Sequence, residues 1–321
     1  MHHRSLLALL LLAAAAAAGC AGATDDACRV GADCASGLCN LDGTCGTTGA
    51  TSSAGTGGQG GEGVGGSATS SSSASTTGAG GDGTGGSGAC VANQDGTITR
   101  DELPFGPGLH ATYRAAPDAP VDTAGVTQGD GSRAWDLTGA LPGDHATIVE
   151  TLAIEGQWFE SVFPGASYAS RLSESQDLLG VFEITGVALL LRGVVTPVGG
   201  ATRTELTYAP PVTVLAFPLH EGDAFATSST VTGLLSGIVW TQTEKYESNV
   251  DAHGVMKTPF ADFDVLRVGV DLTRTVGFQV TTSRTYLFTS ECFGTVAAIV
   301  SQDNELSTEF TDASEVKRLA P

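Results

Sequence analysis

Hydrophobic and polar residues alternate along several stretches of the last two thirds of the chain. Between residues 238 and 251, Trp240 and Tyr246 fall on one face of an extended chain, whereas Lys245 falls on the other, and the stretch 263–272 alternates in the same way. A period of two is typical of β-strands with one buried face. The pattern predicts further strands at 109–115, 147–154, 179–185, 187–195, 203–208, 212–217, 276–282, 284–290, 294–301 and 305–311.

The connections between these stretches are short and rich in Gly, Pro, Asp and Asn, so successive strands are expected to pair antiparallel. A helical period is scarce, and 174–179 is the best short candidate. Residues 90–321 are numerous enough for one domain with a sizeable core. The pattern therefore predicts an all-β domain at 90–321, an antiparallel meander that forms an open or half β-barrel, with a β-sandwich as the alternative.

The front of the chain has the features of a secretory signal peptide at 1–19. A short basic start precedes an apolar run, and small residues lead to Cys20. The apolar run is shorter than the ~20 residues that span a bilayer. The ending Ala17-Ala18-Gly19-Cys20 resembles the lipobox of bacterial lipoproteins, in which the cysteine becomes the lipid-modified first residue.

This resemblance implies lipidation at Cys20, followed by a tether at 20–27, and the alternative is an ordinary signal peptide cleaved near Ala18. Residue 21 is Ala rather than Asp, which in lipoproteins of this kind favours the outer membrane. We therefore expect a protein of the cell envelope that is held on the outer membrane by its N-terminal lipid, so that the membrane is a partner but is not crossed.

A small cysteine module follows at 28–45. Eighteen residues cannot bury a core, so cross-links must order the segment, and the spacing favours disulfides over zinc. The interleaved pairing, Cys28–Cys39 with Cys34–Cys45, would constrain the segment most, although the spacing leaves all three pairings open. The segment resembles short modules of myxobacterial-type surface lipoproteins. Its disulfide candidates are Cys28, Cys34, Cys39 and Cys45.

Residues 46–89 consist almost entirely of Gly, Ser, Thr and Ala, which offer nothing to bury. Such a composition predicts a disordered linker.

The net charge of the whole protein limits the kinds of partner it can bind. Its 15 basic and 35 acidic residues give a net charge of −20. A protein this acidic repels the phosphates of nucleic acids, so a nucleic-acid partner is not expected.

A stretch at 91–102 follows the pattern of a calcium-binding loop from its third position onward. Val91 stands where the first carboxylate belongs, and no flanking helix is predicted, so an Asp-Gly turn is the alternative. Calcium is thus a candidate cofactor with ligands added from elsewhere. The candidate ligands are Asn93, Asp95, Thr97 and Glu102.

Cys90 and Cys292 are the two cysteines of the large domain. Setting Cys20 aside leaves six cysteines, which can all pair in an oxidising compartment. We therefore expect a Cys90–Cys292 disulfide, and a nucleophilic Cys292 is the alternative.

The string 258–268, preceded by the stretch 251–254, resembles a two-strand segment of secreted bacterial β-proteins, and 217–223 resembles the turn before it. Such proteins resemble the half-barrel of lipoprotein carriers. The resemblance implies a concave face that holds acyl chains.

No nucleophile elbow, phosphate loop or zinc-protease motif is present in the sequence. The leading hypothesis is a surface lipoprotein whose β-domain binds or scaffolds, with an apolar ligand, a glycan or an envelope protein as partner. A hydrolase with a dispersed carboxylate site and a carbohydrate-binding module are the alternatives. An apolar trough would favour the ligand-holder, and its predicted lining is Leu189, Leu191, Val214 and Leu266. Stacking on sugars would use Trp135, Trp158 or Trp240.

Overall fold

The structure is a computed structural model that describes residues 90–173 and 175–321. Predictions for the signal peptide, the lipidated Cys20, the small cysteine module and the linker lie outside the described residues. The described part contains β-strands, one 3-10 turn and no α-helix. The all-β prediction is therefore confirmed for the large domain, which lies within one compact unit of the chain, 79–321.

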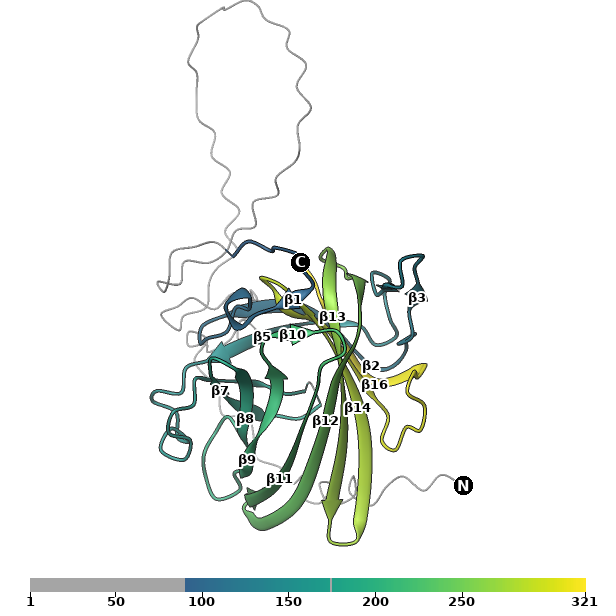
Figure 1. Cartoon of the computed structure of the whole chain (residues 1–321). Helices are drawn as coiled ribbons and strands as arrows, with labels where there is room; N and C mark the ends of the chain where they lie inside the picture. The colour runs from purple at the N-terminus through teal and green to yellow at the C-terminus, as the bar shows by residue number, and fades with distance from the viewer. Residues whose placement is uncertain (1–89, 174) are drawn as a thin grey trace, which may run out of the picture. The chain divides into compact units, whose positions relative to one another are not determined.

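The strands alternate with short connections along the chain (Figure 1). They are β1 Thr97–Ile98, β2 His110–Pro120, β3 Val126–Thr127, β4 Arg133–Asp136, β5 His145–Leu152, β6 Tyr168–Arg171, β7 Leu179–Ile184, β8 Ala188–Val195, β9 Glu205–Ala216, β10 Leu219–His220, β11 Ala224–Leu235, β12 Ile238–Lys257, β13 Asp262–Val276, β14 Gln279–Ser290, β15 Gly294–Ser301 and β16 Asp312–Leu319. The 3-10 turn η2 spans Arg100–Glu102.

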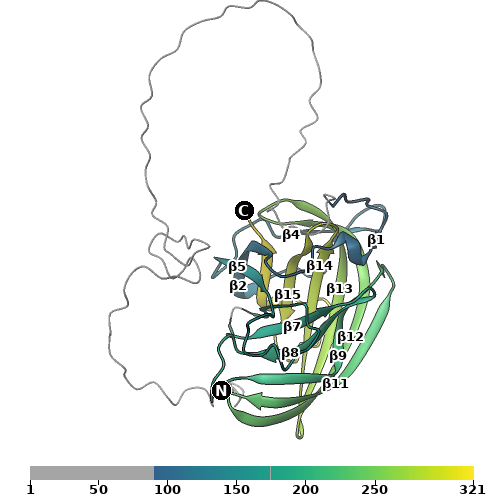
Figure 2. The same cartoon turned by 90° about the vertical axis from the view of Figure 1, so that its left-hand side faces the viewer.

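Twelve of these strands form a closed antiparallel barrel, in the order β2, β5, β6, β7, β8, β9, β11, β12, β13, β14, β15 and β16. Each strand pairs with the next in this order, and the last one, β16, pairs with the first, β2 (Figures 1 and 2). The predicted meander is correct, but the open or half barrel and the alternative sandwich are wrong. The reason is the pairing of β16 with β2, which joins the two edges that an open sheet would leave unpaired.

Strand β12 is long enough to pair with three neighbouring strands. It pairs antiparallel with β11 and β13, and its last residues pair in parallel with β4, which carries β3 at the edge of the sheet. A bulge at Asp251 separates the part that pairs with β11 from the part that pairs with β4. The strands β3 and β4 therefore lie outside the ring of twelve.

Several strand boundaries differ from the prediction. The predicted strands 203–208 and 212–217 are one strand, β9, and the predicted helix at 174–179 is wrong because 175–178 is irregular and Leu179 begins β7. No strand forms at 305–311. This segment is a loop that contributes Glu309 and Phe310 to the packing over the outer face of the sheet.

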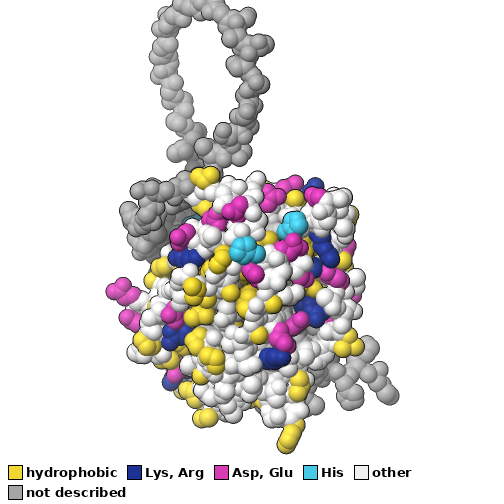
Figure 3. All heavy atoms as spheres, in the orientation of Figure 1, with side chains coloured by type: hydrophobic (Ala, Val, Ile, Leu, Met, Phe, Trp, Pro, Cys, Tyr) yellow, Lys and Arg dark blue, Asp and Glu magenta, His cyan; other side chains and the backbone are white. Residues whose placement is uncertain are grey.

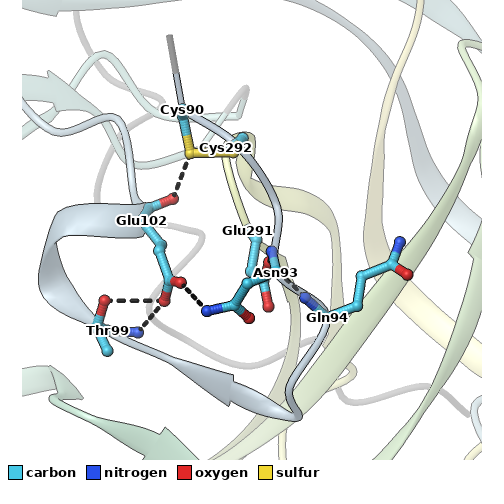
Figure 4. The surroundings of a disulfide bond; sticks show 7 residues. All are labelled: Cys90, Asn93, Gln94, Thr99, Glu102, Glu291 and Cys292. Carbon is cyan, nitrogen blue, oxygen red and sulfur yellow. Dashed lines mark hydrogen bonds between the residues drawn. A yellow bond between two sulfur atoms is a disulfide. The ribbon is translucent and has the colours of Figure 1, made fainter. Parts of the chain in front are cut away.

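The segment that enters the domain, 90–108, closes one end of the barrel. Its strand β1 pairs with β10, and its side chains Ile98 and Leu103 are buried against Leu219. A disulfide joins Cys90 to Cys292, in the turn between β14 and β15, with 5.5 Å between the Cα atoms (Figure 4). The predicted disulfide is confirmed, and it ties the entry segment to the barrel wall.

Candidate binding site in the barrel interior

The inner face of the barrel is identified by contacts between strands that are not neighbours in the ring. Leu189 of β8 and Leu215 of β9 belong to the same buried cluster as Val250 of β12 and Val268 of β13. Because side chains alternate between the two faces of a strand, these positions fix which residues of each strand point inward.

The outer face is covered over much of its area. The loops around β3 and β4, and the segment before β16, pack on the outer side of β12 to β16, and the loop 153–167 packs on β6 to β8. We call the first of these clusters the outer core. Its largest members are Trp135, Met256, Phe263, Tyr286, Phe288, Ile299, Phe310 and Val316.

The exposure of side chains differs from strand to strand around the wall of the barrel. On β11 and β12 the inward Val231, Glu244 and Val250 are buried, and the outward residues of β11 are exposed. On β14, the outward Tyr286 and Phe288 are 1% and 0% exposed, whereas the inward Thr285 and Leu287 are only half-buried. Inward residues of β13, such as Leu272, are half-buried as well. Water therefore reaches part of the inner wall. Eight strands enclose little more than their own side chains, and a ring of twelve encloses more space.

The two ends of the interior differ in chemistry. At the end closed by the entry segment, the inward side chains are apolar and most are buried. These residues are Ile98, Leu103, Tyr168, Leu189, Leu215, Phe217, Leu219, Val250, Leu266 and Val268. Of the predicted trough residues, Leu189 and Leu266 lie in this cluster, while Leu191 and Val214 belong to the adjoining one around Tyr208.

A polar cluster lies toward the other end, on neighbouring strands β12 and β13. The register places Glu244 directly opposite Arg274. The Glu244 carboxylate is fully buried, and it accepts hydrogen bonds from Gln242 Nε2 (2.7 Å), Arg274 Nε (2.7 Å) and Tyr246 Oη (2.6 Å). Three donors thus hold one inward carboxylate in place.

The electrostatics of this cluster favour one protonation state. Burial, assisted by Tyr208 and by the negative charge of Glu244, raises the pKa of Tyr246 well above 10.0, so the phenol remains a donor. Desolvation opposes the charged form of Arg274, but the Glu244 carboxylate outweighs it and raises the pKa of the guanidinium. The side chain of Arg274 is nevertheless 46% exposed.

Charged side chains of β16 also point inward. Lys317 Nζ lies 3.0 Å from the carboxylate of Glu315 and donates to the carbonyl oxygen of Leu172, three strands away in the ring. Both side chains are largely buried. The interior therefore carries two ion pairs, one on β12–β13 and one on β16.

The hairpins that end at this side of the barrel expose apolar side chains and carry no charged residue over 233–243 and 275–283. Ile238 and Val239 project from the β11–β12 hairpin, and Phe278 and Val280 from the β13–β14 hairpin. Hydrophobic side chains project from the lower end of the molecule in Figure 3, where these hairpins end in Figure 1. These two hairpins thus form an uncharged part of the rim, beside loops that carry Arg203, Asp303 and Glu305.

Of the predicted calcium ligands, Asn93 and Glu102 lie side by side in the entry segment (Figure 4). The Glu102 carboxylate accepts hydrogen bonds from Asn93 Nδ2 and from the amide and hydroxyl groups of Thr99, and Asp95 accepts one from the amide of Thr97. No group of three or more His, Cys, Asp or Glu residues suited to a metal is found in 90–173 and 175–321. Calcium binding by this loop therefore stays a prediction, because the side-chain oxygens of Asp95 and Glu102 accept hydrogen bonds from within the loop.

Two hollows open on the outer surface of the domain. One of about 660 Å³ is bordered by Arg114, Asp144 and Arg318, and the other, of about 530 Å³, lies against the loop 154–166. Arg318 is fully buried and donates to Asp144 and to two backbone carbonyls. Because Arg318 and Asp144 are already hydrogen-bonded to each other, this hollow presents few free polar groups to a ligand.

The three tryptophans have different surroundings. Trp135 is buried in the outer core, and its Nε1 donates to the carbonyl of Thr123. Trp158 and Trp240 are half-buried, and their indole nitrogens donate to Thr196 O and Gln242 Oε1. Trp240 points inward near the polar cluster.

No protein-family model matches the chain, and neither a curated protein nor a solved structure is found to be similar to it. The part of the chain that the structure describes contains no helix long and apolar enough to cross a membrane.

Proposed function

We propose that this protein binds an apolar or amphipathic small molecule inside its β-barrel and presents it at the cell envelope, where lipidation of Cys20 holds the chain on the outer membrane. The observation that carries the proposal is the partial exposure of inward side chains on β13 and β14. Outward side chains such as Phe288 are buried, whereas inward ones such as Leu287 and Leu272 remain partly accessible.

An accessible apolar wall in a folded protein is costly in water, because exposed apolar area loses about 25 cal/mol per Å² relative to burial. A ligand that covers Val270, Leu272 and Leu287 recovers this free energy. The uncharged β13–β14 hairpin at the open end, with Phe278 and Val280 exposed, suits the entry of such a ligand.

The two alternative functions have less support from the site. The carboxylate oxygens of Glu244 already accept hydrogen bonds from three donors, which favours a positioning role over proton transfer. A glycan platform requires an exposed pair of parallel rings. Trp135 is buried, and the ring of Trp158 meets Phe159 edge-on, at 90°.

The proposal is tested with the neutral probe N-phenyl-1-naphthylamine, whose fluorescence rises in apolar surroundings. The mature chain is expected to bind it saturably. Substituting Leu272→Trp fills the interior and should weaken binding by about tenfold or more, whereas Thr243→Trp, at an exposed outward position of β12, should leave it unchanged. Absence of saturable binding, or equal effects of both substitutions, would overturn the proposal.

A further inference from the structure

The arginines of the domain differ in how fully their nitrogens are used. Arg318 and Arg267 are 1% and 2% exposed at the side chain, and in each the Nε, Nη1 and Nη2 atoms all donate hydrogen bonds. These two guanidinium groups are saturated by the protein itself. They hold loops against the barrel and have no capacity for a ligand.

Arg274 is different. Its Nε donates to Glu244, but no acceptor for Nη1 or Nη2 is found among residues 90–173 and 175–321, and nearly half of the side chain is exposed. It points inward from β13, two residues after Leu272 on the same face of the strand, and lies opposite Glu244. Two donor nitrogens of a fixed guanidinium therefore face the accessible interior.

The surroundings keep this guanidinium in place and charged. Glu244 is anchored by Tyr246 and Gln242 on the same strand, and it in turn orients the guanidinium through Nε. Charged hydrogen bonds to a planar guanidinium are strong and directional, and the two Nη atoms match the two oxygens of a carboxylate. The other inward cation, Lys317, already contacts Glu315 and Leu172 and is 11% exposed at the side chain.

We infer that Arg274 receives the polar head of the ligand, and that the ligand is an acyl chain or similar apolar body that ends in a carboxylate. The inference rests on the proposed function, because it assigns a head-group position within the same interior. The apolar body extends from Arg274 past Leu272, Val270 and Leu287 toward the dry, closed end of the barrel. Polar head and apolar tail thus each meet matching chemistry.

The test compares dodecanoate with dodecanol, which share the chain and differ in the head group, as competitors of N-phenyl-1-naphthylamine on the mature protein. A charged hydrogen-bonded pair contributes about 1.5–3 kcal/mol, so dodecanoate is expected to compete at least about tenfold more tightly than dodecanol. The variant Arg274→Met should abolish this preference.

Removing Arg274 alone leaves the buried Glu244 without its cation, so the double variant Arg274→Met with Glu244→Gln provides a second, charge-balanced form. It should also bind both competitors equally. If the wild type binds dodecanoate and dodecanol equally, or if the double variant retains the preference, the inference is wrong although the proposed function stands. If neither competitor nor the probe binds, the proposed function itself fails.

Discussion

Two arginines seven positions apart on β13, Arg267 and Arg274, show how the two faces of this barrel differ. Arg267 points outward, is 2% exposed, and donates five hydrogen bonds, to Asp251, Glu309 and Thr123, with its plane over the ring of Tyr286 at 4.2 Å. Arg274 points inward, is 46% exposed, and donates one, to Glu244.

The difference indicates that, along β13 and β14, loops bury the outer face while part of the inner face stays accessible. Loops that cover the outside bury Phe288 and Met256, while the inside keeps half-buried residues such as Leu287. Stability should therefore depend most on outward residues and on the closed end, and ligand affinity on inward residues toward the open end.

The largest effect is expected at the closed end, where the disulfide spans 202 residues. Replacing both Cys90 and Cys292 with Ser should destabilise the domain by up to about 5 kcal/mol, since chain-entropy estimates rise with the length of the closed loop. The melting temperature followed by circular dichroism measures the loss. An unchanged melting temperature would show that the disulfide does not stabilise the domain.

The second prediction compares the two arginines directly. Arg267→Met leaves Asp251 and Glu309 without their shared cation and should cost about 3–5 kcal/mol. The charge-balanced double variant Arg274→Met with Glu244→Gln should cost less than half as much, because Arg274 is half-exposed. Chemical denaturation gives both values, and equal costs would contradict the contrast between the faces.

Two adjacent residues of β14 sharpen the contrast further. Phe288→Ala opens a cavity in the outer core and is expected to cost about 3–5 kcal/mol. Leu287→Ala removes a half-buried inward side chain and should cost under about 2 kcal/mol, while it lowers the affinity for the apolar probe. The reverse order of stabilities would mean that the inner face is the core.

The smallest expected effect is the pH dependence of stability. Burial acts to raise the pKa of Glu309, but the hydrogen bonds and the charge of Arg267 outweigh it and hold the pKa below its ordinary value of 4.5. A carboxylate with a lowered pKa in the folded state stabilises above its unfolded pKa and loses this contribution as the pH falls. Stability should therefore decrease below about pH 4.5, and Glu309→Gln should make that decrease shallower.

The sequence predicted the strands whose inward and outward residues differ in polarity and failed where they do not. β12 and β13 alternate clearly, whereas β11 was missed because its inward Thr227 and Ser229 are as polar as its outward residues. β16 was missed because its charged residues Glu315, Lys317 and Arg318 are typical of a solvent-exposed segment. Only the pairing of β16 with β2 brings Arg318 to its partner Asp144.

The candidate site could not be predicted for the same reason. Glu244 and Arg274 are 30 residues apart and become partners only through the register of β12 and β13. The Cys90–Cys292 disulfide was predictable because counting left each cysteine one partner. Closure of the barrel depends on the pairing of β16 with β2, which lies near the opposite end of the domain and leaves no local pattern.

The accessibility of the inner wall is tested most directly by alkylation of a single introduced thiol. Thr285→Cys places it on the inward face of β14, and Thr243→Cys places a control on the outside of β12. In the folded protein both thiols should react with N-ethylmaleimide, and dodecanoate should protect the first but not the second. A thiol at position 285 that reacts only after unfolding, or that dodecanoate fails to protect, would contradict the account.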